Sequence, residues 1–328
     1  MKLSTRKLTF IMITLILTLF FTIAYGKSSN ENNKPELKFN KDGSFKIVQF
    51  ADPQDGPNID LRTIDLMNKI LDDEKPNLVV LTGDNINGID CTSSEEVKKA
   101  IDNIAQPMEK RQIPWAIVFG NHDEESGKMN KKEMMNTYMS YAYNLSQPGP
   151  SSIDGIGNYN LLIKDSKGKH PIFNIYLLDS GAYAPINFGK YDWIKKSQID
   201  WYSNTSSELK KKYKKTIPSL MFFHIPLPEF RVAWEMGNAI GSRNEEEWPP
   251  KYNSGLFGRL VETKDVLGVF VGHDHTNDYV AELNGIKLGY SGNIGFRNQD
   301  KKKHSKGARV FLIKENTPWK FNTWMDYE

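Results

Sequence analysis

The chain has 328 residues, of which 39% are hydrophobic and 25% charged, a composition that favours a folded globular protein over a disordered one. Its formal net charge of +3 equals the charge of three basic residues near the N-terminus, Lys2, Arg6 and Lys7, so the rest of the chain is neutral. Net charge therefore does not suggest a basic surface that binds nucleic acid, although it leaves room for local basic patches, and no specific binding of nucleic acid is expected.

The first 26 residues carry the pattern of an export signal. The three basic residues precede an uncharged apolar run, residues 8–25, and the small residues Ala24 and Gly26 suit cleavage. The run is also near the length of an uncleaved membrane anchor, although the abrupt change to polar residues favours cleavage. Both outcomes predict export, so the protein is expected to be secreted or held at the cell surface. Contact with the membrane is expected only if the N-terminal segment stays uncleaved.

The following segment, residues 27–41, is polar and has no apolar period, which predicts a flexible spacer before a folded domain at 42–328. The domain begins with a regular alternation of strands and helices. Strands are predicted at 45–51, 78–81 and 114–119, and helices at 59–71, with Asp60 as its cap, and at 97–108. This order predicts a mainly parallel sheet with crossover helices.

The middle of the chain is less regular and its tail is rich in β-structure. Helices are predicted at 128–143 and 194–214, an antiparallel strand pair at 159–163 and 172–178, and further strands at 219–223 and 266–271. The irregular segments 124–160 and 225–256 are expected to form pocket walls.

Polar side chains of the metal-ligand type follow five of the predicted strands. The carboxyl ends of strands in an open α/β sheet converge on one crevice, so these clusters are expected to meet. The clusters are Asp52 with Gln54, then Asp84, then Asn121 with His122 and Asp123, then His224, and last His273 with Asp274 and His275.

The chemistry of these clusters favours hard or borderline divalent ions. Oxygen and imidazole donors without a thiolate suit manganese, iron or zinc. Glycine before Asp84, Asn121 and His273 allows the backbone to turn tightly. Asp84 can bridge two ions, and two ions about 3.5–4 Å apart can clamp a phosphate and lower the pKa of a bridging water.

Each residue taken alone also has a plainer interpretation. Asp84 suits a turn or a helix cap, Asn121 suits a left-handed turn, and His224 suits a hydrogen-bonded core histidine. His273 and His275 could be surface residues. Five clusters in order favour the metal site over these separate explanations.

The ordered set, over residues from about 45 to 290, resembles the calcineurin-like metallophosphoesterase superfamily. The segments 178–183 and 198–201 are similar to its purple-acid-phosphatase-like branch. The resemblance implies a single α/β domain built as a four-layer α/β/β/α sandwich, with two mixed sheets packed together and flanked by helices.

The resemblance also implies roles for single residues. His122 would lie near the leaving-group oxygen as a general acid or a stabiliser of the transition state, and Asp123 would orient a neighbour by a hydrogen bond. The implied ligands of one metal are Asp52, Asp84 and His275, and those of the second are Asp84, Asn121, His224 and His273.

Two positions depart from the family pattern. Gln54 stands where the family usually has a histidine ligand, and an amide oxygen is a weaker ligand than imidazole. The first metal is therefore expected to bind loosely or to be of a different kind. Asn87 stands where purple enzymes have a metal-binding tyrosine, so a coloured iron–tyrosine centre is not expected.

These residues predict hydrolysis of a phosphate ester by in-line attack of a metal-bound hydroxide. The substrate would be a phosphorylated small molecule or polymer, with a monoester favoured over a diester. The alternative is a non-catalytic or weakly active protein that holds a phosphorylated ligand, because of Gln54. Three further residues are weaker candidates for the pocket, with ordinary packing, capping or solvation as the alternative: Asp179, Tyr183 and Arg297.

Overall fold

The computed structural model describes residues 34–297 and 304–328. The predicted export segment and the first part of the predicted spacer lie outside these residues, so both stay predictions. Among the residues that the structure describes, no helix combines the length and the apolar character needed to cross a membrane.

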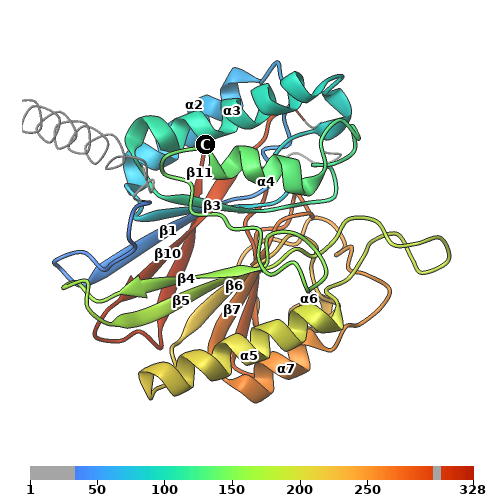
Figure 1. Ribbon diagram of the computed structural model, residues 1–328. Coiled ribbons are helices and arrows are strands. Elements are labelled where there is room, and N and C mark those ends of the chain that lie inside the picture. The colour runs from blue at the N-terminus through green and yellow to red at the C-terminus, as the bar shows by residue number, and fades with distance from the viewer. Residues whose placement is uncertain (1–33, 298–303) are drawn as a thin grey trace, which may run out of the picture. The chain divides into compact units, whose positions relative to one another are not determined.

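The strands form two mixed sheets that lie one above the other (Figure 1). The first sheet has the strand order β11-β10-β1-β2-β3, and the second has the order β4-β5-β6-β7-β9-β8. The strands are β1 (Ser44–Phe50), β2 (Leu78–Thr82), β3 (Trp115–Val118), β4 (Tyr159–Lys164), β5 (Pro171–Leu177), β6 (Ser219–Phe222), β7 (Val266–Val271), β8 (Val280–Leu283), β9 (Ile286–Tyr290), β10 (Gly307–Lys314) and β11 (Phe321–Tyr327).

Helices cover the outer face of each sheet. Figure 1 shows α2, α3 and α4 over the first sheet, and α5, α6 and α7 over the second. The helices are α2 (Leu61–Glu74), α3 (Ser94–Arg111), α4 (Lys131–Met139), α5 (Lys196–Tyr213), α6 (Glu229–Glu235) and α7 (Leu256–Thr263), with a short 3₁₀ helix, η1, at Gly88–Asp90.

The strands are apolar on both faces because both faces are covered. In β1, Phe45 and Ile47 pack between the two sheets, whereas Val48 and Phe50 pack against the helices. Parallel strands buried on both sides read as nearly continuous apolar runs, as this sequence does. The predicted four-layer sandwich of two mixed sheets is confirmed.

Most of the predicted elements are present with shifted ends. Asp60 caps α2, as predicted, by accepting a hydrogen bond from the backbone N–H of Arg62 (3.0 Å). Strands β1, β2 and β3 are parallel neighbours, and β4 pairs with β5 in antiparallel fashion. The short helices α6 and α7 were not predicted, because seven or eight residues give too little apolar periodicity to detect.

The predicted spacer is too long at its C-terminal end. Leu37 and Phe39 are buried and belong to the core between the sheets. Their backbones exchange two hydrogen bonds of 2.9 Å with Lys164 at the end of β4. Two apolar residues in alternation are too few to stand out in a polar segment, so the fold begins earlier than residue 42.

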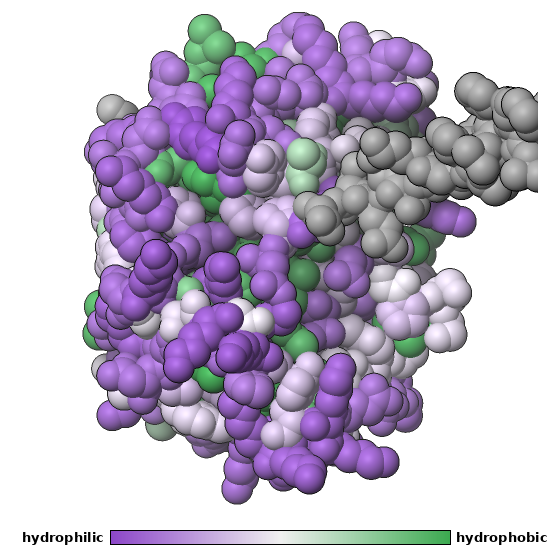
Figure 2. All heavy atoms as spheres, turned by 60° about the vertical axis from the view of Figure 1, so that its left-hand side comes forward, coloured by the Kyte–Doolittle hydropathy of each residue, from purple (hydrophilic) through white to green (hydrophobic). Residues whose placement is uncertain are grey.

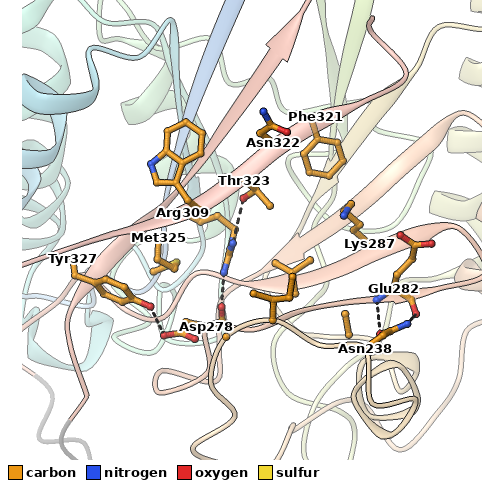
Figure 3. Close-up of a pocket in the computed structure, with 15 residues that line it drawn as sticks. Asn238, Asp278, Glu282, Lys287, Arg309, Phe321, Asn322, Thr323, Met325 and Tyr327 are labelled. Atoms are coloured by element: carbon orange, nitrogen blue, oxygen red, sulfur yellow. Dashed lines mark hydrogen bonds between the residues drawn. The ribbon is translucent and has the colours of Figure 1, made fainter.

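The surface is mostly hydrophilic on the face shown in Figure 2, with small hydrophobic patches between polar side chains. A pocket of about 790 Å³ opens between β8 and β11, the edge strands of the two sheets (Figure 3). Its lining mixes Lys287 and Arg309 with Asp278 and Glu282, and it includes none of the predicted metal ligands. Its charges therefore favour no single class of ligand.

Candidate metal centre

The predicted ligands follow strands of both sheets and come together in space. Two groups of three residues have ligand atoms that all lie within 4.8 Å of one another. One group is Asp84, His224 and His273, and the other is Asp52, Asp84 and His275. Asp84 is common to both groups, which is the place that the sequence predicted for a bridging carboxylate.

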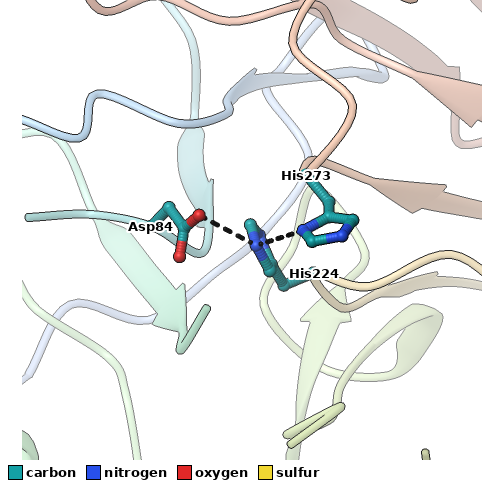
Figure 4. A group of neighbouring side chains, drawn as sticks. All are labelled: Asp84, His224 and His273. Carbon is teal, nitrogen blue, oxygen red and sulfur yellow. Dashed lines mark hydrogen bonds and ion pairs between the residues drawn. The ribbon is translucent and has the colours of Figure 1, made fainter. Parts of the chain in front are cut away.

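The first group converges on Nε2 of His224 (Figure 4). This atom lies 3.2 Å from Oδ2 of Asp84 and 3.2 Å from Nδ1 of His273. Oδ1 of Asn121 lies at the same distance, 3.2 Å. The other ring nitrogen of His224, Nδ1, lies 2.9 Å from the carbonyl of Thr82 and can donate its proton there.

This arrangement fits a divalent cation. The carboxylate oxygen of Asp84 and the amide oxygen of Asn121 carry no proton to donate, so few protons are available for four converging atoms. Nε2 of His273 is in addition buried without a hydrogen-bond partner among the described residues. A cluster of lone pairs with so few donors is what a bound metal ion satisfies.

The electrostatics of this group also favour a positive charge. Burial alone would lower the pKa of His224, but attraction to the carboxylates of Asp84 and Asp52 raises it to about 9. Burial works against ionisation of Asp84, yet His224 and His122 hold the pKa of Asp84 well below its usual range. Burial, reinforced by His224, lowers the pKa of His273 well below its usual value, so its imidazole is neutral, as a ligand requires.

The second group has a longer contact between its ligand atoms. Nε2 of His275 lies 3.6 Å from Oδ1 of Asp52, and the backbone N–H of His273 donates to Oδ2 of Asp52 (3.0 Å). Burial raises the pKa of Asp52 to about 6. Gln54 is buried in the same loop, and its backbone N–H donates to the carbonyl of Asp84 (2.9 Å). A ligand role for the Gln54 side chain stays a prediction.

The backbone is strained at four of the predicted ligands. Positive φ values occur at Asp52 (50°), Gln54 (40°), Asp84 (45°) and His273 (74°). Left-handed conformations are uncommon for residues other than glycine and cost on the order of 1–3 kcal/mol each. Such strain clusters at functional sites, where the surrounding structure holds it in place.

The glycines before the ligands are required mainly for space. A Cβ atom on Gly83 would lie 2.6 Å from the ring of His224, and one on Gly272 would lie 2.5 Å from Oδ2 of Asp52. On Gly120 it would lie 2.1 Å from Oδ1 of Asp84. Among these three glycines, only Gly83 has a positive φ, so the expected tight turn explains Gly83 alone. The close approach of a ligand atom explains all three glycines.

His122 and Asp123 occupy different environments. The ring of His122 is one-third exposed, and its Nε2 lies 3.9 Å from Oδ2 of Asp84. Asp123 is buried and accepts backbone hydrogen bonds from Asn85, Ile86 and Gly120. Burial, together with the charge of Asp84, raises the pKa of Asp123 to about 7. Asp123 thus joins the loops after β2 and β3, while His122 faces the space beside the metal groups.

Glu125 is a site residue that was not predicted from sequence. Oε2 of Glu125 lies 2.7 Å from Nδ1 of His122, and the hydroxyl of Tyr183 donates to Oε1 of the same carboxylate. Tyr183, a weak candidate from sequence, also accepts a hydrogen bond from the amide of Asn121 (3.1 Å). Nothing in the sequence distinguishes Glu125 from its neighbour Glu124, because only the shape of the loop decides which one faces His122.

The other weak candidates lie in structural contacts. Asp179 forms a buried ion pair with Lys131 (2.7 Å) and accepts a backbone hydrogen bond from Ile156. Arg297 forms an ion pair with Asp90 (2.8 Å). Neither belongs to the two groups of candidate ligands, and a role for either in the substrate pocket stays a prediction.

Comparison with known proteins identifies relatives over most of the chain. The profile of the family described as Calcineurin-like phosphoesterase matches residues 45–277. "Probable inactive purple acid phosphatase 14" of Arabidopsis thaliana is 39% identical over 86% of this chain and 78% of the relative. "Phosphatase DCR2" of Saccharomyces cerevisiae is 34% identical over 74% of this chain and 46% of the relative.

A solved structure shares the fold. The crystal structure of a dimetal phosphatase from Danio rerio aligns with a TM-score of 0.56 at 15% identity, over 86% of this chain and 98% of the other. At this identity the likeness concerns the fold alone. The sequence relatives, by contrast, agree with the purple-acid-phosphatase-like branch that the sequence indicated.

Proposed function

This chain belongs to the calcineurin-like phosphoesterase family, and we propose that it hydrolyses phosphate esters at a centre that holds two divalent metal ions. The proposal rests mainly on the position of Asp84, whose carboxylate belongs to both groups of candidate ligands. A shared carboxylate allows two ions to lie close enough to act on one phosphoryl group.

In the proposed site, some residues bind the metal ions and His122 transfers a proton. Asp52, Asp84 and His275 would hold one ion, and Asp84, Asn121, His224 and His273 the other. When bound, the ions polarise the ester and activate a water molecule near neutral pH. His122 would hold a proton at Nε2 for the departing oxygen. The donor set suits manganese, iron or zinc.

The substrate that we propose is a phosphate monoester on a small molecule or a polymer, with a diester as the second choice. The names of two Arabidopsis relatives contain the words purple acid phosphatase, after the words "probable inactive", and this likeness to a phosphatase branch supports a monoester. We also propose that the chain acts outside the cytoplasm, on the basis of its N-terminal sequence. Turnover of chromogenic monoesters and diesters with added manganese tests the proposal, and no turnover with any metal at any pH would contradict it.

A second function is favoured by a specific observation. Gln54 replaces a usual histidine ligand, and the names of two similar Arabidopsis proteins include the words "probable inactive". A chain with one weakly held ion could bind a phosphorylated ligand without turning it over. Binding of a phosphorylated ligand in the absence of turnover would support this alternative.

Replacing Gln54 by histidine should tighten the binding of the more weakly held ion. Imidazole is a better ligand than a neutral amide for these metals, so we expect about a tenfold gain in affinity, or about 1.4 kcal/mol. Calorimetric titration of the metal-free protein with manganese measures the change. An unchanged affinity would indicate that the side chain at position 54 does not contact the metal.

Replacing His122 by alanine should lower kcat without loss of metal. A positioned general acid contributes about 10²–10⁴-fold to the rate, and the effect should be largest for an alkyl phosphate, whose leaving group needs a proton. The metal content and the kcat for glycerol phosphate are measured on the same preparation. Full activity of His122→Ala would remove His122 from the mechanism.

A further inference from the structure

We infer that Tyr183 and Glu125 are positioning residues that fix the orientation of the Asn121 amide and the His122 ring. The inference rests on the proposed phosphatase function, which gives these two groups their importance. Four side chains form one continuous set of hydrogen bonds, from Asn121 through Tyr183 and Glu125 to His122. This set joins a candidate metal ligand to the candidate general acid.

The chemistry of the groups determines the direction of each hydrogen bond. The amide nitrogen of Asn121 can only donate, so the hydroxyl oxygen of Tyr183 accepts from it (3.1 Å). The single proton of that hydroxyl is then directed to Oε1 of Glu125. The carboxylate of Glu125 uses its second oxygen to accept the proton on Nδ1 of His122 (2.7 Å).

The hydrogen bond to Tyr183 determines which atom of the Asn121 amide faces the candidate metal site. An asparagine amide has nearly the same shape when its nitrogen and oxygen exchange places, so a hydrogen-bond partner must select between the two orientations. Because Tyr183 takes the nitrogen of Asn121, the oxygen faces Nε2 of His224 at 3.2 Å. Only the oxygen can bind a metal ion.

The hydrogen bond to Glu125 determines which ring nitrogen of His122, the candidate general acid, faces the centre. A carboxylate that holds Nδ1–H of an imidazole fixes the ring and its tautomer. With Nδ1 held by Glu125, the opposite nitrogen of His122 faces the centre, 3.9 Å from Oδ2 of Asp84. A second proton taken up by the ring is then carried by Nε2, the nitrogen that faces the centre, from which it can pass to the leaving group.

The position of Tyr183 connects the two halves of the fold. Glu125 lies in the loop after β3 of the first sheet, whereas Tyr183 lies after β5 of the second. The ring of Tyr183 stacks on Tyr191 with centroids 6.0 Å apart, and Tyr191 packs edge-on against His273 at 4.3 Å. Tyr183 is therefore linked through Tyr191 to His273, another candidate ligand.

Glu125→Gln tests the role of Glu125 through the leaving group. We expect kcat for an alkyl ester, glycerol phosphate, to fall about a hundredfold, but kcat for p-nitrophenyl phosphate to fall less than about fivefold, because its leaving group needs little protonation. KM and metal affinity should be unchanged. The matched control is Glu124→Gln, whose carboxylate accepts from the backbone of Lys131 instead and which should leave both rates unchanged. Equal losses on the two esters, or no loss, would overturn this role.

A measurement without turnover separates the positioning role from the proposed function. In the metal-free full chain, ¹⁵N chemical shifts should show His122 protonated at Nδ1 in the wild type and in Glu124→Gln, and a changed distribution in Glu125→Gln. The same tautomer in all three proteins would overturn the inference. If the shifts change as expected but the wild type hydrolyses neither ester, the proposed function fails while the positioning role stands.

Tyr183→Phe tests the orientation of Asn121. Loss of the hydroxyl leaves the amide without its acceptor, so we expect manganese affinity to fall about tenfold, the loss typical of an outer partner that orients a ligand. Glu125→Gln should not share this loss. Unchanged manganese affinity in Tyr183→Phe would show that Tyr183 does not select the amide orientation.

Discussion

Replacing Asp84 by asparagine should remove both metal ions and lower turnover by about a thousandfold or more, since metals contribute several kcal/mol to such reactions and each 1.4 kcal/mol is a factor of about ten. Asp84 is the one residue common to the two groups of candidate ligands. Its carboxylate also supports the raised pKa of His224, so the substitution removes the negative charge that attracts a cation to that side of the centre.

The measurement for Asp84→Asn is metal content by mass spectrometry, together with kcat for p-nitrophenyl phosphate. Asp73→Asn serves as the control, because the Asp73 side chain is 60% exposed and forms a surface ion pair with Lys69, away from the candidate ligands. The control should keep its metal and its activity. Retention of two ions in Asp84→Asn would show that Asp84 does not bridge them.

Replacing Gly120 by alanine should damage both the centre and the fold. The new Cβ would lie 2.1 Å from Oδ1 of Asp84 and 2.2 Å from the backbone nitrogen of the same residue. A rotation of the Asp84 side chain relieves the first clash but not the second, so the loops after β2 and β3 must separate. We expect a loss of about 3 kcal/mol in the free energy of unfolding and a loss of metal binding.

Denaturant unfolding of the metal-free protein measures the stability of Gly120→Ala. Gly258→Ala is the matched control, because Gly258 lies inside α7 and a Cβ there meets no atom within 4 Å. Alanine is also the better helix former by about 1 kcal/mol, so the control should be neutral or slightly stabilising. An equally stable Gly120→Ala that binds two ions would contradict the close packing of Gly120 on Asp84.

The candidate ligands could be predicted from sequence because strand order and strand ends determine where they lie. Each of Asp52, Asp84 and Asn121 follows a run of apolar residues, and such runs mark buried strands whose carboxyl ends meet. The sequence pattern is clear because the candidate ligands directly follow strands, which are the most regular part of the fold. The same regularity predicted parallel strands with crossover helices, whereas the four-layer architecture was implied by the family resemblance alone.

The positioning roles could not be predicted, because both residues lie on loops: Tyr183 was a candidate only for the pocket, and Glu125 was not a candidate at all. Glu124 and Glu125 are adjacent and chemically alike, and only the path of the loop after β3 turns one toward His122. Tyr183 reaches Asn121 from another sheet, 62 residues along the chain. Loop geometry depends on many weak contacts that leave no periodic pattern in the sequence.

The glycines that precede the candidate ligands were predicted to allow tight turns, but close packing against the ligands explains them better. Gly272 lacks a positive φ, so backbone flexibility does not account for it, whereas the 2.5 Å approach of its missing Cβ to Asp52 does. A sequence shows that a glycine precedes a ligand, but it does not show which atom lies against it. Close packing of backbone on ligand helps to hold the strained conformations at Asp52 and Asp84.

We propose that one chain holds two metal ions that share Asp84. A crystal of the full chain soaked with manganese and phosphate tests it directly through anomalous scattering. We expect two anomalous peaks, one beside Asp52 and His275 and one beside Asn121, His224 and His273. Asp84 should contact both ions, and the phosphate should lie within reach of His122. A single peak at saturating manganese, or two peaks of which only one contacts Asp84, would contradict it.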